Sequence, residues 1–279
     1  MSELFKAGSA AVITGAASGI GAAAARRFAR QGMRLVLCDV DEARLARLAG
    51  ELGGEVRIVA GDVSRMGDVE RLRDEAFAAF GLVNVLMNNA AIGGSDDESW
   101  RGLDTWRRII EVNLWGVING VHAFAPKMIA QNSRAAIVNT GSKQGITNPP
   151  GHPAYATAKA GVRAVTEQLA HSLREDTGER VSAHLLVPGW TFTGMSRTED
   201  GRKPDGAWTA EQVVDLMVER VASGDFYIIC PDNAVTTALD AARLRWSVDD
   251  MIENRPALSR WHPAWKERFE AFVKRETGA

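Results

Sequence analysis

The stretch that decides the fold is Ala10-Ala11-Val12-Ile13-Thr14-Gly15-Ala16-Ala17-Ser18-Gly19-Ile20-Gly21. Its first part is a short apolar run, and three glycines follow at the spacing Gly-x-x-x-Gly-x-Gly, before an Ala- and Arg-rich segment over residues 22–30. This order predicts a buried strand, a sharp turn and a helix. Such a turn lets the backbone approach a pyrophosphate closely, and the free N–H groups of the helix favour phosphate oxygens. The candidate dinucleotide-binding residues here are Gly15, Ser18, Gly19, Ile20 and Gly21, although an ordinary tight turn has the same glycines.

Six further short apolar runs follow along the chain. They lie at residues 35–38, 56–59, 83–87, 135–138, 181–186 and 226–229. The runs are short and largely unalternating, as strands buried on both faces are, and segments of helical spacing such as 41–52 separate them. The chain is therefore predicted to be an α/β protein, a Rossmann-type, doubly wound, seven-stranded parallel sheet with helices on both faces.

Composition limits the partners of this chain. Its 279 residues include 33 basic and 35 acidic side chains, for a net charge of −2. No large positive field is available, so we expect no nucleic acid and no membrane among its partners. Cys38 and Cys230 are its two cysteines, and they form neither a disulfide framework nor a metal pattern. No signal peptide is seen at the N-terminus, and no apolar run is long enough to span a bilayer. We expect a cytoplasmic protein with no metal site.

Asp39 strengthens the dinucleotide interpretation of the glycine turn. It ends the second predicted strand, 18 residues after Gly21. In dinucleotide-binding folds an acidic residue about 20 residues further on holds the ribose hydroxyls. A carboxylate there also repels a 2′-phosphate, and Ser18 brings no compensating charge, so the sequence favours NAD over NADP. The alternative for Asp39 is an ordinary turn residue before Asp41.

A proton-transfer group is predicted on a later helix. Tyr155 and Lys159 are four residues apart, so the phenol and the ammonium share one helix face. A nearby cation favours the phenolate, which lowers the pKa of the tyrosine and suits it to exchange a proton with an alcohol or ketone. Ser142 follows the strand at 135–138, at the edge of the sheet where ligands of parallel sheets bind. Its hydroxyl is placed to hold a substrate oxygen, unless it is an ordinary turn serine.

The ordered set of these motifs resembles the short-chain dehydrogenases/reductases over roughly residues 6–230. The matching segments are Thr14 to Gly21, Asp62-Val63, Asn88-Asn89-Ala90-Ala91, Asn113 in Val112-Asn113-Leu114-Trp115-Gly116, the set Ser142, Tyr155 and Lys159, and Pro188-Gly189-Trp190-Thr191-Phe192-Thr193. The separation of four between the tyrosine and the lysine argues against the enoyl-reductase branch. The chain length argues against the extended epimerases.

The resemblance implies a role for each matching residue. Tyr155 is the general acid/base, Lys159 lowers its pKa and binds the nicotinamide ribose, and Ser142 positions the substrate oxygen. Asn113 holds a water that relays protons from Lys159 to solvent. The cofactor contacts are Asp62 and Val63 at the adenine, Asn89 and Ala90 along the cleft, and Pro188, Gly189, Thr191 and Thr193 at the nicotinamide carboxamide. The family forms dimers or tetramers, so a homodimer or homotetramer is expected.

Three features depart from the family pattern. Ala91 and Gly141 stand where a glycine and a serine are usual, and the tail beyond residue 231 exceeds the usual length. The tail contains several aromatic residues between charges and two prolines, namely Trp246, Trp261, Trp265, Phe269, Phe272, Pro256 and Pro263. We predict one NAD-binding catalytic domain over residues 1–230, with a substrate lid at about 194–210. Residues 231–279 are predicted to be a helical extension of that domain, since they are too few to bury a core alone.

The expected activity is NAD-dependent interconversion of a secondary alcohol and a ketone. The predicted substrate pocket is lined by residues 145–152, Trp190 and the loop 194–208, and Trp190, Phe192 and Met195 suggest an apolar or aromatic substrate. The same aromatic side chains would also serve simply to pack the loop. The alternative function is a catalytically inactive NAD-binding scaffold or regulatory protein with the same fold.

Overall fold

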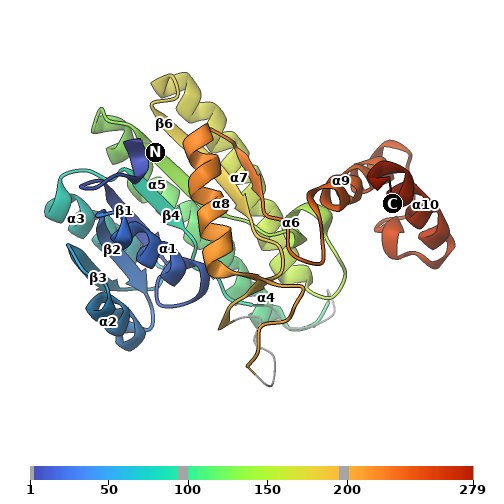
Figure 1. Ribbon diagram of the computed structural model, residues 1–279, viewed down its shortest axis with the longest axis horizontal. Coiled ribbons are helices and arrows are strands. Elements are labelled where there is room, and N and C mark those ends of the chain that lie inside the picture. The colour runs from blue at the N-terminus through green and yellow to red at the C-terminus, as the bar shows by residue number, and fades with distance from the viewer. Residues whose placement is uncertain (1–2, 94–99, 195–200, 279) are drawn as a thin grey trace.

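A computed structural model of the protein describes residues 3–93, 100–194 and 201–278 (Figure 1). Its main sheet has seven strands in the order β3-β2-β1-β4-β5-β6-β9, and every neighbouring pair is parallel. The strands are β1 (Ala10–Thr14), β2 (Arg34–Asp39), β3 (Val56–Ala60), β4 (Val85–Asn88), β5 (Ala135–Thr140), β6 (Val181–Val187) and β9 (Tyr227–Ile229). Each apolar run quoted above forms one of these strands, so the predicted doubly wound parallel sheet is confirmed.

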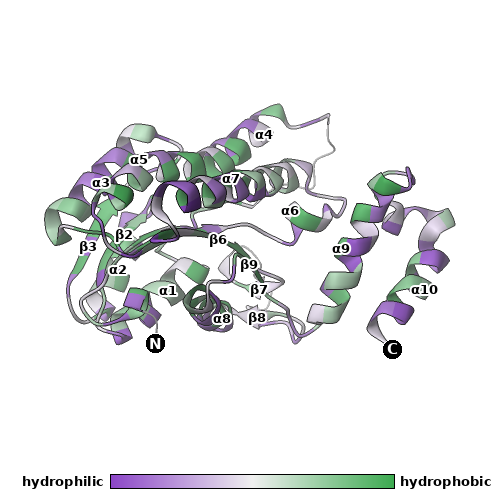
Figure 2. Cartoon of the chain, turned by 90° about the horizontal axis from the view of Figure 1, so that it is seen from above, coloured by the Kyte–Doolittle hydropathy of each residue, from purple (hydrophilic) through white to green (hydrophobic). Residues whose placement is uncertain are grey.

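Helices cover both faces of the sheet (Figure 2). One face carries α1 (Gly19–Arg30) and α8 (Ala210–Ser223), and the other carries α3 (Met66–Phe80), α5 (Gly116–Ala130) and α7 (Pro153–Thr177). Successive residues of β1 supply different cores, because Ala11 and Ile13 pack with α1 whereas Ala10 and Val12 pack with α3 and α5. Two cores sharing one strand explain why its successive residues Ala10, Ala11, Val12 and Ile13 are all apolar.

The remaining elements are short or peripheral. They are η1 (Glu3–Phe5), α2 (Glu42–Glu51), α4 (Leu103–Ile110), the π-helical turn η2 (Glu111–Trp115), α6 (Gln144–Thr147), β7 (Thr191–Phe192), β8 (Trp208–Thr209), α9 (Thr237–Ile252), η4 (Ser259–Trp261), η5 (Pro263–Trp265) and α10 (Lys266–Thr277). The two-residue pair of β7 and β8 was not predicted from the sequence. Among the helices that the structure describes, none combines the length and the apolar character needed to cross a membrane.

A buried polar chain ties β4 and β5 to α7. Asn88 donates through Nδ2 to Asn139 Oδ1 at 2.9 Å, and Asn139 Nδ2 donates to Thr166 Oγ1 at 3.1 Å. Gly120 on α5 leaves room for this chain, because a Cβ there would lie 2.1 Å from Asn88 Oδ1. Buried amides are costly unless they are paired, so these hydrogen bonds fix how α7 sits on the sheet. Tyr155 and Lys159 begin that same helix.

The segment after β9 projects from the body as α9, two short turns and α10 (Figure 1). Trp246 is buried at its centre and meets Trp265, Phe269 and Phe272 in edge-on contacts with ring centroids 5.2–6.2 Å apart. Its indole N–H donates to Ser259 Oγ at 2.7 Å, and the Arg255 guanidinium covers its face at 4.4 Å. These contacts form a small aromatic cluster with its own packing. The domain boundary at residue 230 stays a prediction.

Replacing Trp246 by alanine should release this segment while leaving the sheet intact. Removal of a buried tryptophan costs about 3–5 kcal/mol, and that loss falls on one small cluster. We expect trypsin to cut Trp246→Ala rapidly after arginines of the projecting segment, whereas the rest of the chain resists. Trp100→Ala is the matched control, because Trp100 is exposed. Equal cutting rates for wild type and Trp246→Ala would contradict the assignment.

Candidate active site

The glycine turn is packed so closely that side chains are excluded from it. A Cβ on Gly21 would lie 2.2 Å from the carbonyl oxygen of Gly15, and one on Gly15 would lie 2.7 Å from Ala90 Cα. Gly15 and Gly19 also have φ values of +65° and +52°, which favour glycine. A Cβ on Gly19 would lie 3.2 Å from the methyl carbon of Thr193. The structure therefore brings the turn beside the segments after β4 and β6, the segments that the family resemblance implies for cofactor binding.

Helix α1 begins at this turn with free backbone donors. Ser18 is its N-cap, and within the described residues its side chain makes no capping hydrogen bond. Ile20 packs partly against the core and so fixes the first turn of the helix. The first N–H groups of a helix need partners, and phosphate oxygens meet that need. A turn without side chains and a helix N-terminus thus form a cradle that fits a dinucleotide.

Two acidic candidate residues stand at the ends of the neighbouring strands, Asp39 at the end of β2 and Asp62 just after β3. Asp39 accepts a hydrogen bond from the backbone N–H of Ala17 at 2.9 Å through Oδ2, and one from Asp41 N–H at 3.0 Å through Oδ1. Asp62 binds the backbone N–H and the hydroxyl of Ser64 at 3.0 and 2.8 Å. Asp39 is therefore fixed against the glycine turn, where the dinucleotide rule expects the ribose.

Thr14 holds the wall of the cleft, a role that the sequence analysis did not assign to it. Its hydroxyl oxygen accepts hydrogen bonds from Asn89 N–H at 3.0 Å and Ala90 N–H at 3.1 Å. Asn89 Nδ2 donates back to the Thr14 carbonyl at 3.1 Å, and Thr140 donates to Asn89 Oδ1 at 3.5 Å. Both threonines end a strand at the ligand-binding edge, and that position was the available signal.

Two further candidates are held below the cleft. Val63 is buried and its carbonyl accepts from Asn119 Nδ2 at 2.9 Å. Asn113 is fully buried in the π-helical turn η2, and its amide pairs with the backbone N–H and C=O of Ile92 at 2.8 and 2.9 Å. The amide of Asn113 therefore anchors the segment after β4. The water relay expected of Asn113 stays a prediction.

Ser142, Tyr155 and Lys159 converge at the carboxyl edge of the sheet. The Ser142 side chain lies close enough to Tyr155 to act on the pKa of its phenol. Lys159 Nζ lies 5.7 Å from the centre of the Tyr155 ring and donates to the carbonyl oxygen of Thr140 at 2.7 Å. Gly145 on α6 presses against the Lys159 backbone, since a Cβ there would lie 2.5 Å from the Lys159 carbonyl carbon. A phenol, an ammonium and a hydroxyl thus share one site, as the spacing predicted.

The pKa of Tyr155 departs from the sequence-based expectation. Burial raises the pKa of Tyr155 above its usual value, and the hydrogen bond from Ser142 acts in the opposite direction. The sequence predicted a pKa lowered by Lys159. That direction is wrong for this structure, because the phenolate is desolvated and the ammonium lies beside the ring, bonded to the Thr140 carbonyl. Burial also lowers the pKa of Lys159 to about 8.

The segment after β6 forms the opposite side of the site. Lys143 N–H donates to the Pro188 carbonyl at 3.4 Å, and Thr191 Oγ1 donates to the Gly189 carbonyl at 3.1 Å. Trp190 is 48% exposed, and its ring packs on Gly206. Of the predicted lid, residues 195–200 lie outside the described residues, and so does Met195 of the expected apolar wall.

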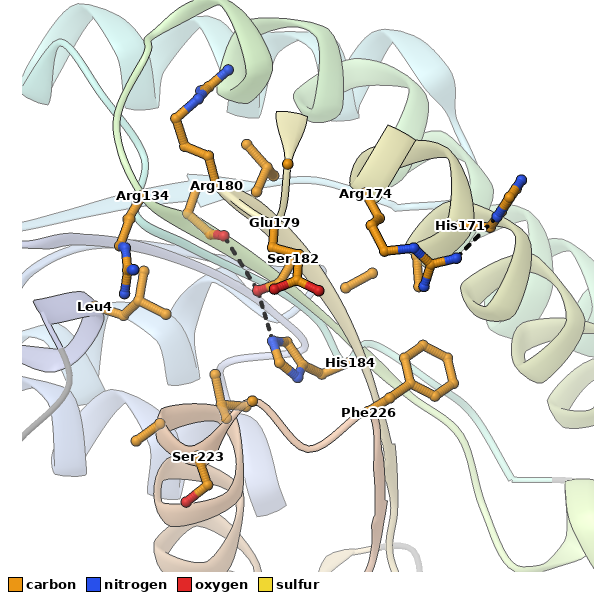
Figure 3. Close-up of a pocket in the computed structure, with 18 of the residues that line it drawn as sticks. Leu4, Arg134, His171, Arg174, Glu179, Arg180, Ser182, His184, Ser223 and Phe226 are labelled. Atoms are coloured by element: carbon orange, nitrogen blue, oxygen red, sulfur yellow. Dashed lines mark hydrogen bonds between the residues drawn. The ribbon is translucent and has the colours of Figure 1, made fainter. Parts of the chain in front are cut away.

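A separate cavity of about 780 Å³ opens at the other end of the sheet. Its lining includes the starts of β5, β6 and β9, and two pairs of its polar side chains contact each other (Figure 3). Ser182 Oγ lies 2.8 Å from His184 Nε2, and Arg174 lies 3.1 Å from His171 Nδ1. Ligands of doubly wound sheets bind at the carboxyl ends of the strands. The candidate active site is therefore the group of strand ends and loops around Tyr155.

The lowered pKa of Lys159 predicts a stability that depends on pH. Between pH 8 and 10.5 the unfolded chain keeps a proton that the folded chain has lost, so the wild type gains stability as the pH rises. Lys159→Met lacks this proton. Relative to wild type, the free energy of unfolding of Lys159→Met should therefore become smaller as the pH rises. We expect this relative loss to reach up to about 3 kcal/mol over the range. Urea unfolding at a series of pH values measures it, with the exposed Lys6→Met as control. A difference that stays constant with pH would contradict the buried ammonium.

Comparisons with known proteins agree with this geometry. The family model described as short chain dehydrogenase matches residues 9–203. The chain is 37% identical over 250 residues to 1-deoxy-11-beta-hydroxypentalenate dehydrogenase of Streptomyces exfoliatus, which covers 87% of this chain and 88% of that protein. It is 33% identical over 213 residues to 3beta-hydroxysteroid dehydrogenase 1 of Eggerthella lenta, covering 75% and 80%.

A solved structure extends the likeness to the fold. The crystal structure of a short chain dehydrogenase/reductase from Burkholderia phymatum in complex with NAD superposes with a TM-score of 0.81 at 37% identity, covering 90% of this chain and 96% of that one. Sequence and fold lead to the same conclusion: the chain belongs to the short-chain dehydrogenase/reductase family of oxidoreductases.

Proposed function

We propose that the protein is an NAD-dependent dehydrogenase that interconverts a secondary alcohol and a ketone by direct hydride transfer. The observation that carries the proposal is the buried Lys159 ammonium, which lies 5.7 Å from the centre of the Tyr155 ring and donates to the Thr140 carbonyl at 2.7 Å, with Ser142 near the same phenol. A proton donor or acceptor, a hydrogen-bond donor and a cation in one site are the groups that carbonyl reduction and alcohol oxidation require. All three lie at the edge of the sheet that carries the glycine turn.

The residues at the turn fit a nicotinamide dinucleotide. Gly15, Gly19 and Gly21 leave the backbone bare, and the N-terminus of α1 offers its N–H groups to the pyrophosphate. The free oxygen lone pairs of the Asp39 carboxylate suit the ribose hydroxyls, and its charge opposes a 2′-phosphate. The bound nicotinamide supplies the hydride acceptor for oxidation and the donor for reduction. We therefore favour NAD, with Asn89, Ala90 and the segment Pro188–Thr193 along its path.

The protein's own side chains move the proton. In oxidation, Tyr155 takes the hydroxyl proton of the substrate while hydride leaves the carbinol carbon, and in reduction it returns a proton to the carbonyl oxygen. Ser142 donates a hydrogen bond to that oxygen and stabilises the charge that develops on it. Lys159 is proposed to bind the nicotinamide ribose, with its ammonium held in place by the Thr140 carbonyl at 2.7 Å. Asn113 is proposed to support the return of protons from solvent.

An apolar secondary alcohol is the substrate class that the site favours. Trp190 follows Gly189 directly and is 48% exposed, and its indole is proposed as an apolar wall for the substrate. The relatives named above act, by name, on a hydroxypentalenate and on a hydroxysteroid. Both names specify hydroxyl groups on compounds that suit such a wall. We further propose a cytoplasmic homodimer or homotetramer, in keeping with the sequence-based expectation.

Replacing Tyr155 by phenylalanine should remove most of the activity. The change deletes only the hydroxyl that exchanges the proton, and loss of a general acid/base costs about 10²–10⁴-fold in kcat. NADH absorbance measures turnover with a panel of cyclic, aromatic and primary alcohols. Tyr227→Phe is the matched control, because Tyr227 is the other tyrosine and bonds Glu167 at 2.7 Å on the far side of the molecule.

The outcomes separate mechanism from function. Turnover of Tyr155→Phe within a few-fold of wild type would refute Tyr155 as the proton-transfer group. No turnover by the wild type with any alcohol or ketone, despite NADH binding, would favour the alternative of an inactive scaffold.

The carboxylate of Asp39 predicts the choice of cofactor. Asp39→Asn keeps the shape and the acceptor for Ala17 N–H but removes the charge, so repulsion of a 2′-phosphate is lost. We expect the affinity for NADPH relative to NADH to rise about tenfold, or about 1.4 kcal/mol. Fluorescence titration of the reduced cofactors measures the ratio. Asp41→Asn is the control, since an asparagine also caps α2. An unchanged ratio in Asp39→Asn would overturn the proposed NAD selection.

A further inference from the structure

A buried cluster of three charges lies directly behind the candidate active site. Lys143 follows Ser142 in the chain, and its Nζ lies 2.6 Å from Asp240 Oδ2 and 3.3 Å from Asp232 Oδ2. The three side chains are 16%, 7% and 3% exposed. Charges this far from water are costly unless they are paired in good geometry. We call this set the Lys143 cluster.

The cluster joins three segments that are distant in the sequence. Lys143 belongs to the turn after β5, Asp232 follows β9, and Asp240 lies in the first turn of α9. Asp232 Oδ2 also accepts the backbone N–H of Trp190 at 3.1 Å, and its Oδ1 accepts that of Ala234 at 3.0 Å. One carboxylate therefore binds both Lys143 and the segment after β6.

Close packing at Gly189 leaves this arrangement little freedom. A Cβ on Gly189 would lie 2.6 Å from Asp232 Oδ2 and 2.9 Å from Lys143 Nζ. The ion pair of Lys143 and Asp232 thus lies directly against the backbone of Gly189, which is part of the candidate nicotinamide-binding segment. Lys143 itself follows the candidate substrate-binding Ser142 in the chain. Lys143 N–H meanwhile donates to the Pro188 carbonyl at 3.4 Å. Both the backbone and the side chain of Lys143 hold the two segments together.

We propose that Lys143 is a positioning residue that sets Ser142 relative to the segment Pro188–Thr193, and that Asp240 links the projecting C-terminal segment to this setting. The role of the cluster in turnover rests on the proposed function, because it acts through Ser142. If Lys143 and Asp240 only attached the C-terminal segment to the body of the protein, a solvent-exposed ion pair would be sufficient. The buried pair that passes over Gly189 instead transmits the position of α9 to both sides of the reacting centre. Misplacement of reacting groups by about 1 Å costs up to 10²-fold in rate.

The test compares Asp240→Asn, Lys143→Met and the double variant with wild type. Asp240→Asn keeps the shape of the cluster and so guards against a variant that fails to fold. We expect about a tenfold loss of kcat in each single variant, with KM for NAD changed less than threefold, because the adenosine half is bound elsewhere. The double variant should lose no more than Lys143→Met, since both changes break one contact.

Hydrogen exchange provides a readout that does not depend on turnover. Peptides covering residues 140–147 and 187–193 should exchange faster in Asp240→Asn and Lys143→Met than in wild type. Arg245→Met is the matched control, since it removes a 2.7 Å ion pair to Glu276 within the same C-terminal segment. That control should leave kcat and both peptides unchanged.

The possible results divide clearly. Unchanged kcat and unchanged exchange in a folded Asp240→Asn would overturn the proposal, as would additive losses in the double variant or the same losses in Arg245→Met. If the wild type turns over no alcohol, the proposed function fails, and the exchange of the two peptides alone then decides whether the cluster positions them.

Discussion

The contact between bare backbones at the carboxyl edge of the sheet is the constraint on which the site depends. Gly21 touches the carbonyl of Gly15, and Gly15 touches Ala90, with no room for a single methyl group between them. Thr14 fixes the same junction through two backbone N–H groups. This close approach brings the ends of β1 and β4 together at the point where the strand order reverses, which is where a parallel sheet opens a crevice.

The chemistry of the site depends on burial as much as on proximity. Lys159 is desolvated and Tyr155 nearly so, and each is thereby pushed toward its neutral form. The Thr140 carbonyl offsets part of the cost by accepting from the ammonium at 2.7 Å. Both side chains belong to α7, and the buried hydrogen bonds that join Asn88, Asn139 and Thr166 fix the position of this helix on the sheet. Burying the Lys159 cation thus costs stability, and the same low dielectric strengthens the electrostatic interactions within the site.

The sequence predicted those parts of the molecule that depend on local pattern. The five central strands were recognisable because they are buried on both faces, and the partly exposed edge strands β3 and β9 because they are short apolar runs. Ser142, Tyr155 and Lys159 were recognisable because their order and spacing are specific. Contacts between distant segments were missed. In the sequence Thr14 and Thr140 look like ordinary strand residues, because their partner Asn89 is distant along the chain. Lys143 likewise has no recognisable partner in the sequence, because Asp232 and Asp240 come much later. The direction of the Tyr155 pKa shift was also missed, since desolvation is a property of the assembled fold.

The aromatic cluster around Trp246 has a consequence for how this chain tolerates change. Its aromatic rings and Arg255 pack against one another, and none of these side chains belongs to the two large cores that flank the sheet. Insertions, deletions and altered side chains in the outer part of the C-terminal segment leave those cores untouched. Evolution can therefore reshape this appendage between related proteins while the sheet and its two cores keep their form.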